Sequence, residues 1–321
     1  KEDIHLWHIN KCQIPRTNES TGKIEWVNIK NYIKFISAAI KSIRVNKLEL
    51  IHVHTSIKYS LLKDSFTIWL VKKVFGLQTV LQIHFAKTDG ILAKKGIWKK
   101  ITIYFIKSGV DQLLVLGKNV ATMVEQHGFN PNKIKTITYF HTAYLDQSFR
   151  QLPQSDIIEL LFMGSIDERK GIMDLLSALE RITPSNWRLK IAGEFKSETF
   201  KDKLLGNSVF IKLKSKIDFL GYVSGTDKEN LFVNADALVL PSYGEGLPLS
   251  ILEALFYNVA IVTTNVGANK ENLDKISNLI IPGDVTALST EINKLILDRD
   301  YLKLRKEQSF KLSEQFTFAA F

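Results

Sequence analysis

Two glutamates eight positions apart are the residues of this sequence best suited to do chemistry. Glu245 lies in a turn bracketed by Gly244 and Gly246, and Glu253 lies in the helix expected to follow. In that arrangement the two carboxylates can reach different parts of one extended ligand. Taken singly, each also has a structural interpretation: Glu253 as a core carboxylate with satisfied hydrogen bonds, and Glu245 as a solvated loop residue.

The start of the expected helix adds a second binding feature. Pro248 suits the first helical turn, because its missing N–H would have no partner there. The N–H groups of Leu249 and Ser250 would then point outward at the positive end of the helix, a suitable place for a diphosphate or a sugar hydroxyl. Gly244 and Gly246 allow the backbone to approach such a ligand closely.

The elements that must position these residues alternate between strand and helix. In the first half, strands are predicted at residues 51–53, 79–83, 113–116 and 134–137, with helices at 61–75 and ending near Gly128. In the second half, strands are predicted at 158–163, 188–192, 237–240 and 260–263, with helices near 170–182, 248–257 and 285–297. This alternation predicts an α/β protein built of βαβ units around parallel sheets.

Length and composition predict two domains. The 321 residues correspond to about two domains at roughly 150 residues each. A polar cluster at 147–156 around Pro153 marks the expected linker. We therefore expect Rossmann-like domains at 1–150 and 151–321 that face each other across a cleft. Ligands of such sheets bind outside the carboxyl ends of the strands, so the site is expected between the halves.

The two halves differ in charge. The net charge of the chain is +10, but residues 1–150 carry 23 basic and 10 acidic side chains, whereas residues 151–321 carry 20 and 23. The basic half fits nucleic acid, an anionic membrane surface or a plain solvated lysine-rich surface. No apolar run reaches the roughly 18 residues of a membrane-spanning helix. The single cysteine, Cys12, favours a reducing compartment.

Residues 241–255, PSYGEGLPLSILEAL, resemble the signature of the retaining nucleotide-sugar glycosyltransferases of the GT-B fold, glycosyltransferase family 4. That signature is E-x7-E, with glycine after the first glutamate and a glutamate–alanine pair in the next helix, and Glu245 to Ala254 match it throughout. The likeness covers most of residues 50–300. By this resemblance the chain looks truncated at its start, because the family's first strand and glycine-rich loop would precede Lys1.

Further segments are similar to the family's donor site. FMGSIDERKGIMDLL at 162–176 looks like its donor loop, with Lys170 and Gly171 in matching places. The family has arginine directly after the loop's glycine, where this chain has Ser165, and Arg169 is the candidate to supply that charge instead. Weaker matches are IAG at 191–193, FLGYV at 219–223, TTNVGANKE at 263–271 and PGD at 282–284.

The resemblance implies transfer of a sugar from a nucleotide-diphosphate sugar to an acceptor hydroxyl, with the anomeric configuration retained. Basic side chains and the helix start would stabilise the departing diphosphate, while Glu245 would hold the donor sugar and Glu253 the ribose. The implied catalytic residues are Glu245 and His84, a strand-end histidine. The implied donor-binding residues are Ser165, Arg169, Lys170, Gly193, Gly221, Tyr222, Val223, Gly246, Leu247, Pro248, Leu249 and Glu253.

The same resemblance implies that neither a metal ion nor another cofactor is required, because fixed cations and N–H groups would carry the diphosphate charge. DRD at 298–300 looks like the metal-binding Asp-x-Asp element of a different glycosyltransferase fold. Its place after a helical stretch near the C-terminus favours solvated charge instead. The sequence has no P-loop, full GxGxxG or GxSxG motif. It therefore lacks the motifs typical of nucleotide hydrolases, nicotinamide-dependent dehydrogenases and serine hydrolases.

Three alternatives remain open from the sequence. A sugar-nucleotide 2-epimerase could use the same architecture without an acceptor. A non-catalytic GT-B subunit could bind a partner or a membrane, as Ser165 and the missing start would allow. Nucleic-acid binding ranks last, because no helix-turn-helix, zinc finger or aromatic RNA-binding motif accompanies the basic half.

Residues 94–107 predict a helix with lysines beside an aromatic and aliphatic surface. Such a helix can rest on anionic lipid, although an apolar face buried in the domain core would explain the pattern too. We therefore expect a cytoplasmic enzyme, peripheral on the inner face of the cell membrane. Its acceptor would be lipid-linked or part of a growing surface polysaccharide.

Overall fold

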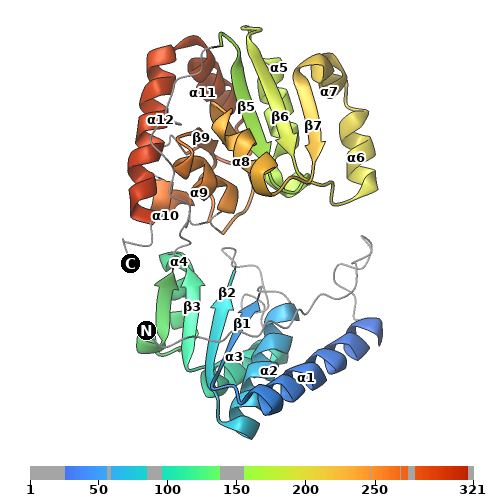
Figure 1. Cartoon of the computed structure of the whole chain (residues 1–321), viewed down its shortest axis with the longest axis vertical. Coiled ribbons are helices and arrows are strands. Elements are labelled where there is room, and N and C mark those ends of the chain that lie inside the picture. Colours follow the sequence, from blue (N-terminus) through green and yellow to red (C-terminus); the bar gives the residue numbers. More distant parts are fainter. Residues whose placement is uncertain are drawn as a thin grey trace. The chain divides into compact units, whose positions relative to one another are not determined.

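The computed structural model describes residues 26–55, 59–84, 96–137, 155–246, 248–267, 269–273 and 279–316. The chain divides into two compact units (Figure 1). Unit 1 comprises residues up to 137, and unit 2 comprises residues from 138 onward together with Gly117–Asn119. Most of the predicted linker at 147–156 lies outside the described residues. The division at 150 therefore stays a prediction.

Unit 1 is a parallel four-stranded sheet with its helices. The strands are β1 (Leu50–Thr55), β2 (Gln78–Ile83), β3 (Gln112–Leu116) and β4 (Ile134–Ile137), in the order β1-β2-β3-β4. The helices are α1 (Trp26–Asn46), α2 (Tyr59–Phe75), α3 (Ile97–Gly109) and α4 (Lys118–Glu125), and a short 3-10 helix, η1, spans Pro131–Lys133. The sheet and helices share a core that includes Leu61, Ile68, Leu81, Ile83 and Val115.

Unit 2 is a parallel five-stranded sheet. Its strands are β5 (Ile158–Met163), β6 (Trp187–Ala192), β7 (Ile217–Gly221), β8 (Ala237–Leu240) and β9 (Ala260–Thr263), in the order β7-β6-β5-β8-β9. Its helices are α5 (Ile172–Glu180), α6 (Glu198–Leu205), α7 (Ser208–Leu213), α8 (Gly225–Val233), α9 (Leu249–Phe256), α10 (Asn269–Leu273), α11 (Val285–Leu297) and α12 (Arg299–Ser313). Short 3-10 helices are η3 (Glu168–Lys170), η4 (Lys214–Lys216) and η5 (Glu314–Phe316).

The strand order of unit 2 determines where a ligand can bind. From β5 the chain adds β6 and β7 on one side, then returns to add β8 and β9 on the other. A crevice opens at such a reversal, because the loops after the two central strands leave in opposite directions. Strand β8 is buried along its whole length, which fits the apolar sequence AlaLeuValLeu of a central strand.

Two parallel sheets with packed helices confirm the predicted α/β class. Each predicted strand is present, with its ends within two residues of the prediction. Strand β7 and the helices α1, α6, α7, α8, α10 and α12 were not predicted as such. Pro248 differs from its prediction: it is the N-cap of α9, with φ −62° and ψ 128°, and so lies one position before the first helical turn.

The DRD sequence at 298–300 belongs to a helix start. The Asp298 carboxylate accepts a hydrogen bond from the Tyr301 N–H at 2.8 Å and so caps α12. Arg299 donates to the carbonyls of Ser155 and Asp156 at 3.1 and 2.8 Å. Among the described residues, no group of three or more His, Cys, Asp or Glu side chains is arranged to hold a metal ion. The structure thus gives this sequence a capping role.

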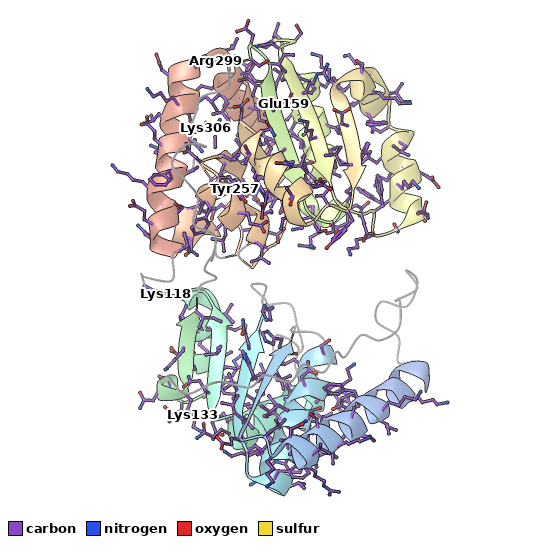
Figure 2. The ribbon with its side chains drawn as sticks, viewed as in Figure 1. Lys118, Lys133, Glu159, Tyr257, Arg299 and Lys306 are labelled. Carbon is purple, nitrogen blue, oxygen red and sulfur yellow. The ribbon has the colours of Figure 1, made fainter. Side chains whose placement is uncertain are left out.

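Buried, charged side chains of helix α12 donate hydrogen bonds to residues in and next to the sheet. Lys306 donates to Asp236 Oδ1 at 2.9 Å, and Arg305 donates to the carbonyl of Ile261 on β9 at 2.7 Å. Figure 2 labels Lys306 on the helix. Removing one member of such a pair leaves an uncompensated buried charge, so α12 is held in one register beside β9. No helix within the described ranges has the length and apolarity to cross a membrane.

Candidate functional site

Unit 2 contains a cavity of about 610 Å³. It lies at the carboxyl ends of β5, β6 and β7 and at the N-terminal ends of α8 and α9. The residues that line it are Met163, Gly164, Ser165, Lys170, Ala192, Gly193, Glu194, Lys196, Tyr222, Val223, Ser224, Gly225, Lys228, Glu245, Pro248, Leu249, Ser250 and Glu253. The cavity thus lies outside the carboxyl ends of the strands, where ligands of parallel sheets bind, while a site between the two halves stays a prediction.

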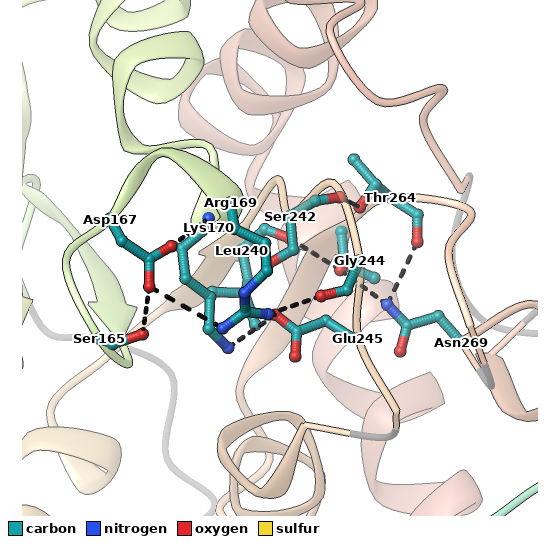
Figure 3. Close-up of polar contacts among 11 residues, drawn as sticks. Ser165, Asp167, Arg169, Lys170, Leu240, Ser242, Gly244, Glu245, Thr264 and Asn269 are labelled. Atoms are coloured by element: carbon teal, nitrogen blue, oxygen red, sulfur yellow. Dashed lines mark hydrogen bonds and ion pairs between the residues drawn. The ribbon is translucent and has the colours of Figure 1, made fainter. Parts of the chain in front are cut away.

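Glu245 is held by two cations from the loop after β5. Its Oε1 atom lies 2.6 Å from Lys170 Nζ and 3.4 Å from an Arg169 guanidinium nitrogen. Arg169 also donates to the Gly244 carbonyl at 2.7 Å (Figure 3). The side chains of Lys170 and Glu245 are only 11% and 8% exposed, so little water competes with the pair. The carboxylate is thus fixed at the edge of the cavity.

Local sequence explains how Lys170 reaches this position. The Asp167 carboxylate accepts hydrogen bonds from the Lys170 N–H at 3.1 Å and from Ser165 Oγ at 2.8 Å, which closes the turn η3. The next residue, Gly171, has φ 71°, a conformation that side chains disfavour. A Cβ at Gly171 would lie 2.0 Å from the Pro241 carbonyl oxygen. Glycine therefore lets the loop after β5 approach the turn after β8.

A buried set of hydrogen bonds supports the turn that carries Glu245. Thr263 Oγ1 donates to the Leu240 carbonyl at 2.8 Å, and Thr264 Oγ1 donates to the Ser242 carbonyl at 2.5 Å. The Asn269 amide in turn donates to the Thr264 carbonyl at 3.2 Å (Figure 3). Side chains that bond neighbouring carbonyls in a dry interior hold both loops in one geometry. This gives Thr263, Thr264 and Asn269, which belong to the weaker sequence match at 263–271, a role in supporting the turn of Glu245.

Glu253, which also lines the cavity, has its own cation. Its Oε1 atom lies 2.5 Å from Nζ of Lys228, which belongs to the first turn of α8. The side chains are 18% and 32% exposed, respectively. Burial raises the pKa of Tyr257, one turn after Glu253, and the negative charges of Glu229 and Glu253 raise it further. Lys228 is thus the cation that the structure pairs with Glu253.

The start of α9 lines the cavity with two backbone N–H groups that have no partner among the residues the structure describes. The first backbone bond within this helix runs from the Ile251 N–H to the Pro248 carbonyl at 3.0 Å. Leu249 and Ser250 precede that bond, line the cavity and have no side-chain cap. The N–H groups of a first helical turn attract anions and hydroxyl oxygens. The sequence prediction for these two residues agrees with this geometry.

Two glycines bring the loops after β5 and β6 together. A Cβ on Gly193, which has φ 151°, would lie 1.8 Å from the Gly164 carbonyl oxygen. The loops then pair through a parallel bridge between Ile166 and Phe195. Both glycines line the cavity, so no side chain separates the backbone from a ligand at the ends of β5 and β6.

These features together suit an extended, polyhydroxylated and anionic ligand. Lysines and helix N–H groups bind phosphate, and fixed carboxylates accept hydrogen bonds from hydroxyls. Because Glu245 and Glu253 lie on different elements, they can engage separate parts of that ligand. The exposed ring of Tyr222 adds an apolar surface at the third strand end.

Most of the predicted donor residues line this cavity. Nine predicted site residues do so: Ser165, Lys170, Gly193, Tyr222, Val223, Glu245, Pro248, Leu249 and Glu253. Arg169 donates to the Gly244 carbonyl, lies 3.4 Å from Glu245 and is not among the lining residues, so its role in donor binding stays a prediction. Gly221 and Gly246 adjoin the cavity without lining it, and Leu247 lies outside the described residues.

His84 lies in unit 1, directly after β2. Its Nε2 atom is 2.6 Å from Nδ1 of His54, and the two rings stack with centroids 4.9 Å apart. His52 stacks on His54 in turn, at 4.4 Å. Burial lowers the pKa of His52, as does the charge of His54, while a hydrogen bond with Gln82 opposes both. The cavity of unit 2 thus contains one of the two predicted catalytic residues.

Sequence reasoning missed three charged lining residues: Glu194, Lys196 and Lys228. Lys228 belongs to α8, a helix that was not predicted because its apolar residues show little helical periodicity. Glu194 and Lys196 follow the IAG sequence at 191–193, and their place directly after a strand end was the available signal. Strand ends in parallel sheets are where ligand contacts concentrate.

Several curated relatives carry names that refer to the cps region or to surface-glycan synthesis. The chain is 22% identical over 268 residues to an uncharacterized 41.2 kDa protein in the cps region of Klebsiella pneumoniae, covering 79% of this chain and 71% of that protein. It is 26% identical over 253 residues to a Campylobacter jejuni α-1,4-N-acetyl-D-galactosaminyltransferase whose name specifies a glycan linked to undecaprenol through PP, covering 75% and 65%. It is 24% identical over 238 residues to the capsular polysaccharide biosynthesis glycosyltransferase CapM of Staphylococcus aureus, covering 73% and 56%. The chain therefore spans less than two thirds of the last two proteins.

Structural comparison supports the fold. The crystal structure of the Anabaena protein HepE in complex with UDP superimposes with a TM-score of 0.73 at 15% identity, covering 89% of this chain and 79% of that one. Such GT-B neighbours confirm the predicted fold class. The family model described as "Glycosyl transferases group 1" matches residues 146–311, more than half of the chain. The chain belongs to the glycosyl transferases group 1 family.

Proposed function

We propose that this glycosyltransferase moves a sugar from a nucleotide-diphosphate sugar to a hydroxyl of a lipid-linked or polysaccharide acceptor, with retention and without a metal ion. The observation that carries the proposal is the cavity of unit 2, in which two fixed carboxylates, Glu245 and Glu253, flank lysines and a helix N-terminus. UDP in the HepE crystal structure is consistent with a nucleotide ligand.

In this proposal the reaction is driven by stabilising the leaving group. As the bond between sugar and diphosphate lengthens, positive charge develops on the sugar and negative charge on the diphosphate. Lys170 and the N–H groups of Leu249 and Ser250 interact more strongly as that negative charge grows, which lowers the barrier. A metal ion would serve the same purpose, so fixed cations make it unnecessary.

The carboxylates have separate roles in the proposal. Glu245, which lies between Lys170 and the turn after β8, accepts hydrogen bonds from the donor sugar. Glu253 accepts hydrogen bonds from the ribose, and its ion pair with Lys228 holds that carboxylate in place. The catalytic role predicted for His84 by family likeness belongs to the same proposal.

The proposed place of action is the inner face of the cell membrane. Helix α3 exposes Ile97, Trp98 and Tyr104 at 62%, 60% and 57%, although it buries Thr102, Ile106 and Gly109 against unit 1. Lys100 and Lys107 are exposed on the same helix. Apolar side chains with adjacent lysines suit an anionic lipid surface. The names of the Campylobacter and Staphylococcus relatives support a lipid-linked or capsular acceptor.

The test is product analysis with a panel of UDP-, GDP- and ADP-sugars, with and without undecaprenol-linked glycans, in EDTA. We expect release of one nucleoside diphosphate that depends on the acceptor, and a product whose anomeric configuration by NMR equals that of the donor. Glu245→Gln should lower the rate by about a hundredfold or more, whereas Glu229→Gln, an exposed control on α8, should leave it unchanged. An isomerised donor without transfer would indicate a 2-epimerase, and donor binding without turnover would indicate a non-catalytic subunit.

A further inference from the structure

The lysines that line the cavity are not equivalent. Lys170 is paired with Glu245 at 2.6 Å, and Lys228 with Glu253 at 2.5 Å, so each already balances a carboxylate. Lys196 is exposed and makes no ion pair within the part of the chain that the structure describes. Its charge is thus available to a ligand.

The backbone of Lys196 is fixed although its side chain is exposed. The Lys196 N–H donates to the Ile166 carbonyl at 3.2 Å, and the Ile166 N–H donates to the Glu194 carbonyl at 2.8 Å. One residue later, Ser197 caps α6 by accepting from the Phe200 N–H at 3.1 Å. Only the side chain of Lys196 needs to order when an anion binds, which limits the entropic cost.

The position of Lys196 matches a gap in the positive lining of the cavity. The bridge between Ile166 and Phe195 sets the loop of Lys196 alongside the loop of Ser165. Ser165 is neutral and donates to Asp167, while Arg169 is turned to Gly244 and Glu245. The bare backbone of Gly164 and Gly193 lies at the same strand ends.

We infer that Lys196 binds the diphosphate of the donor and neutralises the charge that develops on it as the sugar departs. This inference rests on the proposed function and names a residue of the same site. Glu194 lies two residues earlier on the loop and also lines the cavity. The lining then carries three lysines and three glutamates among the described residues, so each change at this loop alters the charge that a diphosphate meets.

The test is isothermal titration of UDP, GDP and ADP, and of their monophosphates, into the whole chain and its variants. Lys196→Ala should weaken binding of the preferred diphosphate by about tenfold, the range of one charge-assisted contact. The monophosphate should lose less. Glu194→Gln should tighten diphosphate binding, and Lys196→Arg should retain it. Lys214→Ala, an exposed lysine on η4 outside the cavity, is the matched control, and circular dichroism melts check folding.

The outcomes separate the two claims. If the wild type binds a diphosphate and Lys196→Ala binds it equally well, the role of Lys196 is overturned while the proposed donor site stands. If Lys196→Ala and Lys214→Ala weaken binding equally, the effect is general surface charge, and the inference is again overturned. If the wild type binds none of the three diphosphates, both the inference and the proposed function fail.

Discussion

At the scale of single residues, the site depends on glycines as much as on charges. Gly193 has φ 151°, and a Cβ there would meet the Gly164 carbonyl oxygen at 1.8 Å. At Gly221, with φ 68°, a Cβ would meet nothing within 4 Å. A side chain at Gly221 would therefore cost only the free energy of its backbone conformation, whereas one at Gly193 would also collide with a neighbouring loop.

We therefore expect Gly193→Ala to lower the free energy of unfolding by about 3 kcal/mol or more, and Gly221→Ala by about 1 kcal/mol. Urea denaturation followed by circular dichroism measures both. Equal effects of the two substitutions would mean that the loops after β5 and β6 do not approach each other as described.

At the scale of elements, the sequence predicted the strands well and the helices around them less well. Strands such as β5 and β8 are short apolar runs, buried on both faces, and local sequence suffices to recognise them. Strand β7 lies at an edge and is partly exposed, so its sequence lacks that signal. Helix α12 has a mostly polar sequence and is held by ion pairs such as Lys306 with Asp236, which only the fold brings together.

The same limit applies to the site. The sequence pointed to Glu245 and Glu253 because the two residues lie only eight positions apart, within one turn and the helix that follows it. Lys228 lies 25 positions before its partner Glu253, so no local pattern reveals the pair. For Arg169 the charge is visible in the sequence, but its hydrogen bond to the Gly244 carbonyl, 75 positions later in the chain, is not.

For helix α3, we expect charge reversal to release the protein from membranes. Replacing Lys99, Lys100 and Lys107 by glutamate should reduce binding to phosphatidylglycerol vesicles by at least roughly tenfold, since each nearby lysine contributes about 1 kcal/mol. Flotation assays measure this. The control exchanges three exposed lysines of unit 2, at positions 212, 214 and 303, for glutamate. Equal loss in both variants, or none, would contradict a role for α3.

For strand β1, the lowered pKa of His52 predicts a pH dependence. In the unfolded chain the His52 imidazole takes up a proton near pH 6.5, whereas in the folded chain it does so only at a lower pH. Stability is therefore retained above about pH 6.5 and lost as the pH falls toward the folded pKa. The melting temperature should drop less between pH 7.5 and 5.5 in His52→Gln than in the wild type. An identical drop would show that His52 does not contribute.

At the scale of the whole molecule, the two units have separate hydrophobic cores. Differential scanning calorimetry should therefore resolve two transitions. Only one should rise when a binding nucleotide is added, because every lining residue of the cavity belongs to unit 2. A single transition, or equal shifts in both, would contradict this division.

The central claim is that the cavity of unit 2 binds a nucleotide-diphosphate sugar through Glu253. The most direct measurement is a thermal-shift panel of UDP-, GDP- and ADP-sugars on the wild type, Glu253→Gln and the control Glu229→Gln. Ligand at about 100 times its dissociation constant stabilises by roughly 2.7 kcal/mol. We predict a shift from one nucleotide class in the wild type and in Glu229→Gln that is lost in Glu253→Gln. No shift from any donor, or an equal shift in all three proteins, would contradict the claim.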